Sequence, residues 1–201
     1  MGMNRFPVEQ YASLELNQVA FPKTGMVVSQ TPLGEKFVEG GSGNYGVCEN
    51  GMWVVADKAK GVIDAPGAAT DKPIGIVYTA EKEYDNFHYG LKTFGRKVAG
   101  DYPRVGILGL GDTVTTNCLQ YSTSVFANDA ALDTYLKGDL TSAPSYVIID
   151  VTNTTGNVAI PGVPAIVKAL PQNYAGAYGR IVKYYTVPNG EKGVKYQIIS
   201  L

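Results

Sequence analysis

Glycine and proline divide this chain of 201 residues into short segments, and their spacing limits what it can fold into. There are 24 glycines and 11 prolines, and the runs between them are rich in Val, Ile, Thr and Tyr. Short runs of β-branched and aromatic residues bounded by turn residues are typical of strands. We therefore expect a mainly β fold, a β-sandwich or β-barrel-like domain with one short helix.

The turn residues also suggest how the chain is organised. Residues 1–24 hold two prolines and only weak apolar alternation, which predicts an extended N-terminal arm. Residues 25–138 are expected to form a β-rich domain, and residues 145–201 a C-terminal β subdomain. A small, polar stretch at 138–145 (GDLTSAPS) has the composition of a linker between them.

One segment has the signals of a helix. Residues 128–137 begin with Asn128, a good N-cap residue, followed by Asp129, whose charge suits the positive end of a helix. Gly138 follows the last apolar residue and is expected to end the helix in the left-handed conformation. This should be the longest regular helix of the chain.

Three hairpins or turns are predicted from local sequence. Asn50-Gly51 between apolar runs favours a two-residue turn in which both residues have positive φ. Gly111-Asp112 is expected to turn the strand before it into a returning strand. Segments 180–187 and 193–199 predict a final hairpin with a longer loop.

Charge and hydropathy argue against two classes of partner. The net charge is −1 and the pI is near 5.8, so no concentrated basic face is expected to draw nucleic acid. Arg96-Lys97 and the pair Lys192 and Lys195 look like ordinary solvated surface. No apolar run approaches the ~18 residues of a membrane span, and the N-terminus lacks the apolar region of a secretory signal.

The chain shows no catalytic constellation that we recognise. His88 is the single histidine, and only Asp85 or Asp112 could orient it as a base. A GxGxxG match at 41–46 lies between β segments, where the dinucleotide fingerprint needs a following helix. Glu81, Glu83 and Asp85 would share one face of a strand, and we interpret them as solvated. We expect no enzyme activity and no cofactor.

Two further groups have a structural interpretation and a functional one. Asp112 with the threonines of 113–116 suits side-chain bonding to the turn backbone better than a metal or phosphate site. Cys48 and Cys118 lack the CxxC spacing of a zinc site. We expect two free, partly buried thiols, while a disulfide between them stays open.

Several turn-and-strand motifs occur in a suggestive order. They are GMWVVADK from Gly51, PIGIVY from Pro73, YPR from Tyr102, GDTVTTN from Gly111 and VPNGEKGVKY from Val187. Over residues 20–201 this arrangement resembles the capsid decoration (cement) and minor structural proteins of tailed bacteriophages. The resemblance implies a non-enzymatic virion protein that binds the major capsid protein on the capsid exterior and stabilises the shell. It also implies a homo-oligomer, with a trimer favoured, that passes through the host cytoplasm during assembly.

The predicted arm is the expected partner-binding element. Its apolar side chains would bury little against their own domain, so we expect them to dock on a neighbouring subunit or on the capsid. These residues are Phe6, Tyr11, Leu14, Leu16, Val19 and Phe21. Unpaired strand edges would offer a second means of association.

Two other functions stay open at this point. The 14 tyrosines favour a carbohydrate- or ligand-binding β module of a phage fibre or tail, because tyrosine presents a stacking face. A hydrolase would have to use His88 with Asp85 or Asp112.

Overall fold

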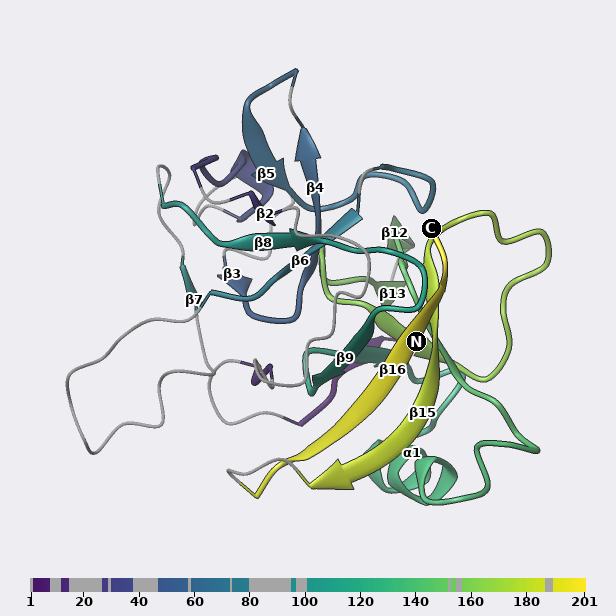
Figure 1. Cartoon of the computed structure of the whole chain (residues 1–201). Coiled ribbons are helices and arrows are strands. Elements are labelled where there is room, and N and C mark those ends of the chain that lie inside the picture. Colours follow the sequence, from purple (N-terminus) through teal and green to yellow (C-terminus); the bar gives the residue numbers. More distant parts are fainter. Residues whose placement is uncertain are drawn as a thin grey trace.

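The structure is a computed structural model, and it describes residues 2–7, 12–14, 27–28, 30–37, 47–57, 59–72, 74–79, 95–96, 101–151, 153–154, 157–186 and 190–201. It is mainly β, with 40% strand and 8% helix, and two larger sheets of seven and five strands. This confirms the predicted fold class, and the arrangement is sandwich-like (Figure 1).

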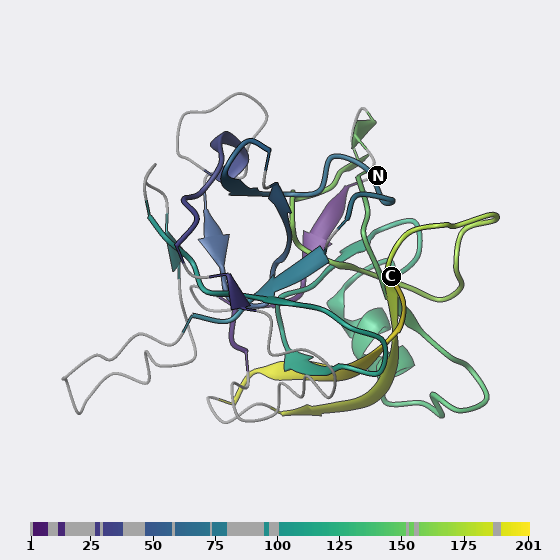
Figure 2. The same ribbon diagram turned by 45° about the horizontal axis from the view of Figure 1, so that its top comes forward.

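The larger sheet is antiparallel except for one parallel pair, β10 with β14. Its long β15–β16 hairpin lies to one side of the five-stranded sheet in both views (Figures 1 and 2). In spatial order its strands are β1 (Met3–Arg5), β10 (Gln120–Ser122), β14 (Ala165–Val167), β11 (Tyr146–Ile148), β15 (Tyr178–Thr186), β16 (Lys192–Ser200) and β9 (Thr113–Thr116).

The smaller sheet is wholly antiparallel, and two short pairs accompany it. Its spatial order is β2 (Val27–Val28), β8 (Val105–Ile107), β6 (Ile74–Val77), β4 (Trp53–Asp57) and β5 (Val62–Asp64). The short pairs are β3 (Cys48–Glu49) with β7 (Gly95–Arg96) and β12 (Asn153–Thr154) with β13 (Asn157–Val158). A 3-10 turn, η2 (Glu35–Phe37), precedes β3.

Alternation along the strands explains how the layers pack. In β4, Trp53 joins a core shared with the seven-stranded sheet, while Val54 joins a second core on the opposite face. In β16, Tyr196 faces the shared core. The indole Nε1–H of Trp53 donates to the Tyr196 hydroxyl at 2.8 Å, so one buried hydrogen bond links the two sheets. Burial raises the pKa of Tyr196 far above its usual range.

The predicted helix is present as α1 (Asp129–Leu136). Asn128 has extended backbone geometry, and its side-chain oxygen accepts the Ala131 N–H at 2.9 Å, as a cap should. Leu132 and Leu136 are buried against the larger sheet's core. The expected left-handed ending was wrong: Gly138 is not among the glycines with positive φ, and its N–H donates to Tyr135 in a 3-10-type turn.

The predicted Asn50-Gly51 hairpin is wrong, although the turn exists. Gly51 has φ of +91°, whereas Asn50 is not among the positive-φ residues, and β3 and β4 do not pair. The Asn50 amide instead exchanges two hydrogen bonds with the backbone of Thr79, at 2.8 and 2.9 Å. These bonds direct the chain from β3, which pairs with β7, into β4 of the five-stranded sheet. In a hairpin, β3 and β4 would instead pair with each other.

The final hairpin is confirmed, because β15 and β16 pair along their length with two register irregularities. The three predicted parts do not correspond to separate sheets. The seven-stranded sheet takes β1 from residues 1–24, β9 and β10 from residues 25–138, and its other four strands from residues 145–201.

Candidate functional site

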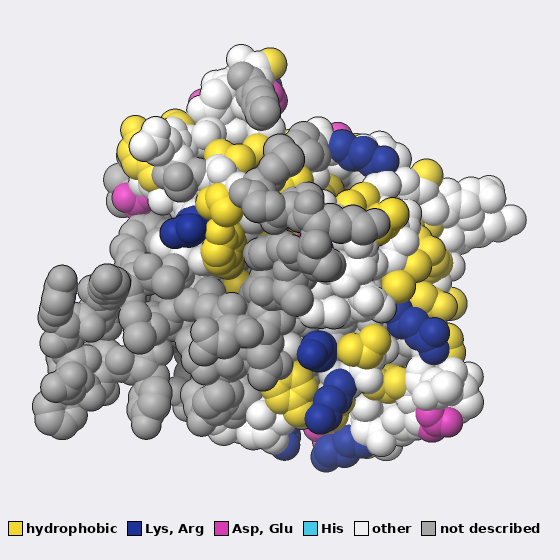
Figure 3. Space-filling model, in the orientation of Figure 1, with side chains coloured by type: hydrophobic (Ala, Val, Ile, Leu, Met, Phe, Trp, Pro, Cys, Tyr) yellow, Lys and Arg dark blue, Asp and Glu magenta, His cyan; other side chains and the backbone are white. Residues whose placement is uncertain are grey.

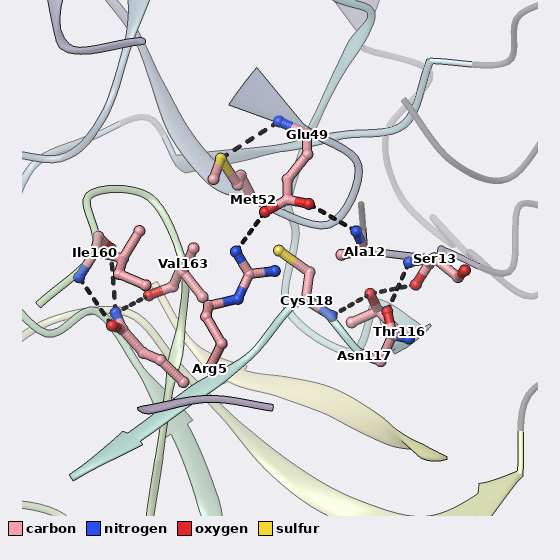
Figure 4. Close-up of polar contacts among 11 residues, drawn as sticks. Arg5, Ala12, Ser13, Glu49, Met52, Thr116, Asn117, Cys118, Ile160 and Val163 are labelled. Carbon is pink, nitrogen blue, oxygen red and sulfur yellow. Dashed lines mark hydrogen bonds and ion pairs between the residues drawn. The ribbon is translucent and has the colours of Figure 1, made fainter. Parts of the chain in front are cut away.

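Buried polar contacts hold the N-terminal residues against the rest of the fold (Figure 4). We call these contacts the anchoring cluster, and its members are Arg5, Ala12, Ser13, Glu49, Thr116 and Asn117. Glu49 is 1% exposed, and both of its carboxylate oxygens are used. Oε1 pairs with Arg5 Nη1 at 2.5 Å, and Oε2 accepts the Ala12 N–H at 2.6 Å. A buried carboxylate needs such partners to offset its lost hydration.

Ser13 is held by its backbone in the same cluster. Its N–H donates to Asn117 Oδ1 at 2.6 Å, and its carbonyl accepts the Thr116 hydroxyl at 2.7 Å. The Asn117 amide also donates to Glu191 at 2.6 Å, which connects the cluster to the residue before β16. These contacts fix residues 12–14 against β9, where Leu14 bridges Thr116.

Two of the six predicted partner contacts are therefore part of this chain's own core. Phe6 is 2% exposed and Leu14 is fully buried, so the expectation that they bury little against their own domain was wrong for both. The reason is the anchoring cluster, which brings the flanking backbone into the interior. The other four residues, Tyr11, Leu16, Val19 and Phe21, lie outside the described residues.

The two cysteines are free and fully buried. Burial is the main cause that raises the pKa of both thiols well above its ordinary value, and the charge of Glu49 adds to it. A thiol in this setting stays protonated, and only the thiolate is a strong nucleophile or metal ligand. Cys48 and Cys118 act here as small apolar core residues, as expected.

Asp112 bonds to the turn in the way its sequence context predicted. Oδ2 accepts the Gly109 N–H at 2.6 Å, and the main chain of Asp112 and Gly111 exchanges hydrogen bonds with Ile198. Oδ1 is buried and has no hydrogen-bond partner among the described residues, and burial raises the pKa of the carboxyl. The turn joins β8 of the smaller sheet to β9 of the larger one.

The remaining predicted catalytic and cofactor residues fall outside the described part of the chain. These are His88, Glu81, Glu83, Asp85 and the 41–46 loop. Within the described part, no three His, Cys, Asp or Glu side chains are grouped so that they could hold a metal ion.

A groove of about 270 Å³ runs between α1, the N-terminal residues and the hairpin. Two of its polar groups bond to each other, because the Tyr184 hydroxyl donates to the Asp133 carboxylate, which also accepts a hydrogen bond from Lys137 of the helix's last turn. These hydrogen bonds lower the pKa of Asp133, and the bond from Lys137 has the larger effect. These groups join the helix to the hairpin, which is a structural role.

The outer surface of β15 and β16 carries exposed and half-buried side chains of both charged and apolar type. We define the hairpin face as the side chains that point away from the shared core, namely Arg180, Val182, Lys183, Lys195, Gln197 and Ile199. Val182 is 48% exposed and Ile199 is 44% exposed. Figure 3 shows dark-blue and yellow side chains interspersed where the hairpin runs in Figure 1.

The charge of the hairpin is strongly one-sided. Its two strands contain Arg180, Lys183, Lys192 and Lys195 and no Asp or Glu, although the whole chain has net charge −1. Register places Lys183 directly opposite Lys195. Within the described residues, the side chains of Arg180, Lys183 and Lys195 form no hydrogen bond or ion pair.

Sequence reasoning predicted neither the anchoring cluster nor the hairpin face. Arg5 and Glu49 are far apart in the chain, so no local pattern indicates that they pair. Lys192 and Lys195 were interpreted as ordinary surface. The alternation of β16 could have placed Lys195 outward, but its alignment with Lys183 depends on the irregularity between Ile181 and Lys183.

Three tyrosines also gather near the start of the hairpin. Tyr178 contacts the rings of both Tyr146 and Tyr174 in edge-on geometry, at 6.0 and 6.5 Å between centroids. The Tyr174 hydroxyl bonds to the backbone of Ile149 and Ala177, and its burial raises the pKa to about 12. These half-buried rings pack against each other and do not present one flat stacking face.

No helix in the described part of the chain is long and apolar enough to cross a membrane. Comparison with known proteins adds no relative: no protein-family model, no curated protein and no solved structure matches this chain.

Proposed function

We propose that this chain is a non-enzymatic structural protein that binds the outer surface of a tailed-phage capsid and stabilises the shell. The order of its turn-and-strand motifs, which resembles that of capsid decoration proteins, suggests this role. The mainly β, sandwich-like fold is compatible with it.

The observation that carries the proposal is that the reactive groups of the described chain are buried in its interior. Glu49, both thiols and Asp112 are buried, and the Arg5 side chain is only 16% exposed. The Arg5–Glu49 pair and Asp112 make contacts that join separate strands or sheets. On the hairpin face, Lys183, Val182 and Ile199 are instead exposed to another molecule, and Arg180 and Lys195 are partly exposed. Such a division suits a protein that acts through its surface.

The proposed partner is the major capsid protein, and the proposed assembly is a homotrimer on the capsid exterior. Docking by the whole N-terminal arm is no longer part of the proposal, because Phe6 and Leu14 are core residues. The carbohydrate-binding alternative receives less support, since the tyrosine cluster is packed edge-on and half-buried.

The test is the protein content of purified particles. Virions of the phage that encodes this chain are purified through a density gradient and analysed by quantitative mass spectrometry and electron microscopy. The proposal expects the chain in fixed stoichiometry to the capsid protein, as density on the outer shell. Its absence from particles, or its location only in a fibre or tail, would refute the capsid role.

A further inference from the structure

We infer that the hairpin face is the docking surface of this chain and that its occupant is an acidic patch on another protein. That this other protein is a capsid shell rests on the function proposed above, whereas the chemistry of the patch comes from the face itself.

The first argument is the arrangement of charge. Cross-strand partners have Cβ atoms about 5 Å apart, and like charges placed directly opposite each other destabilise a sheet. Lys183 and Lys195 are such partners, and neither has a carboxylate from the described chain beside it. The isolated fold therefore gains nothing from this pair, whereas a carboxylate from outside could accept hydrogen bonds from both ammonium groups.

The second argument is the apolar content of the same face. Val182 and Ile199 are among the most exposed large apolar side chains of the described residues, and they lie on the strands that carry the lysines. Burying them would add a hydrophobic contribution to the charged contacts. Protein interfaces combine apolar and charged groups in this way.

The same features favour a protein over nucleic acid. Binding to a phosphate backbone relies on many Lys and Arg contacts, and the hairpin offers four cations, with apolar side chains between them. Half-exposed valine and isoleucine have no partner on a phosphate backbone. They do fit the apolar atoms that surround carboxylates on a protein surface.

The experiment reverses single charges on the full-length chain. K183E and K195E alter the hairpin face, and K60E is the matched control. Lys60 is exposed over 75% of its side chain, lies in the turn between β4 and β5, and gives the same change in net charge. K183E and K195E each place opposite charges across the strands, so the melting temperature of these two variants should stay level or rise.

Binding is measured by co-sedimentation with phage heads from which the chain has been removed, and separately with poly-L-glutamate. The wild type and K60E should bind both, with affinity that falls as salt rises. K183E and K195E should each bind at least about tenfold more weakly, because a like charge then faces the acidic partner.

The outcomes separate the inference from the proposed function. If the wild type binds poly-L-glutamate through this face but does not bind heads, the capsid role fails and the docking surface stands. If K183E and K195E bind heads as tightly as the wild type, the inference fails and the capsid role stands. No binding to poly-L-glutamate, tighter binding to a DNA duplex, or a face that serves only self-association in ultracentrifugation would also overturn it.

Discussion

Replacing Leu14 with alanine should destabilise the protein strongly, because its side chain is fully buried in the shared core. Truncating a buried leucine to alanine typically costs about 2–5 kcal/mol, which combines lost transfer free energy with the cavity left behind. For a chain of this size each kcal/mol lowers the melting temperature by about 2–4 °C. L14A should therefore melt about 4–20 °C below the wild type.

Leu110 provides a matched control, because it is the same residue type at 51% exposure. L110A should change the free energy of unfolding by less than about 0.5 kcal/mol. Both variants are compared with the wild type by urea unfolding, followed by tryptophan fluorescence. If L14A is as stable as L110A, the N-terminal residues do not pack in solution as described, and the free arm expected from the sequence would be correct.

Three other predictions follow from buried polar groups. Y196F should lower the free energy of unfolding by about 1–3 kcal/mol, because the indole N–H of Trp53 loses its acceptor. Urea unfolding measures this change, and an unchanged free energy of unfolding would show that the bond is not formed. Asp112 has a raised pKa when folded, so the folded state binds its proton more tightly than the unfolded state; its contribution to stability should fall as pH rises from the ordinary carboxyl value through the raised one. The stability difference between wild type and D112N should show this slope across that pH range, and a flat difference would contradict it. Cys48 and Cys118 should resist a thiol reagent at about pH 8 in the native protein and react fully in guanidinium, whereas fast native reaction would argue against their burial.

Local sequence signals predicted the elements whose structure depends on local chemistry. Asn128 caps α1 because its side chain reaches a backbone N–H three residues on. Asp112 bonds to Gly109 for a similar reason. The β15–β16 hairpin follows from two β-rich runs joined by turn residues.

The failures came from contacts between residues far apart in the chain. The sequence around Asn50-Gly51 resembles a hairpin, but the bonds to Thr79 send the following strand into another sheet. Phe6 and Leu14 looked too isolated to pack, because nothing local indicates that Glu49 holds the N-terminal backbone. Of the candidate site, the lysines could be named from sequence, but their register could not.

Lysine footprinting of the virus particle tests the central claim most directly. Free protein and purified particles are treated with an amine-acetylating reagent, and modification at each lysine is quantified by mass spectrometry. The account predicts that Lys183 and Lys195 are modified readily in the free protein and protected in the particle, while Lys60, in the turn between β4 and β5, reacts equally in both. Equal modification of Lys183 and Lys195 in the two samples would contradict it.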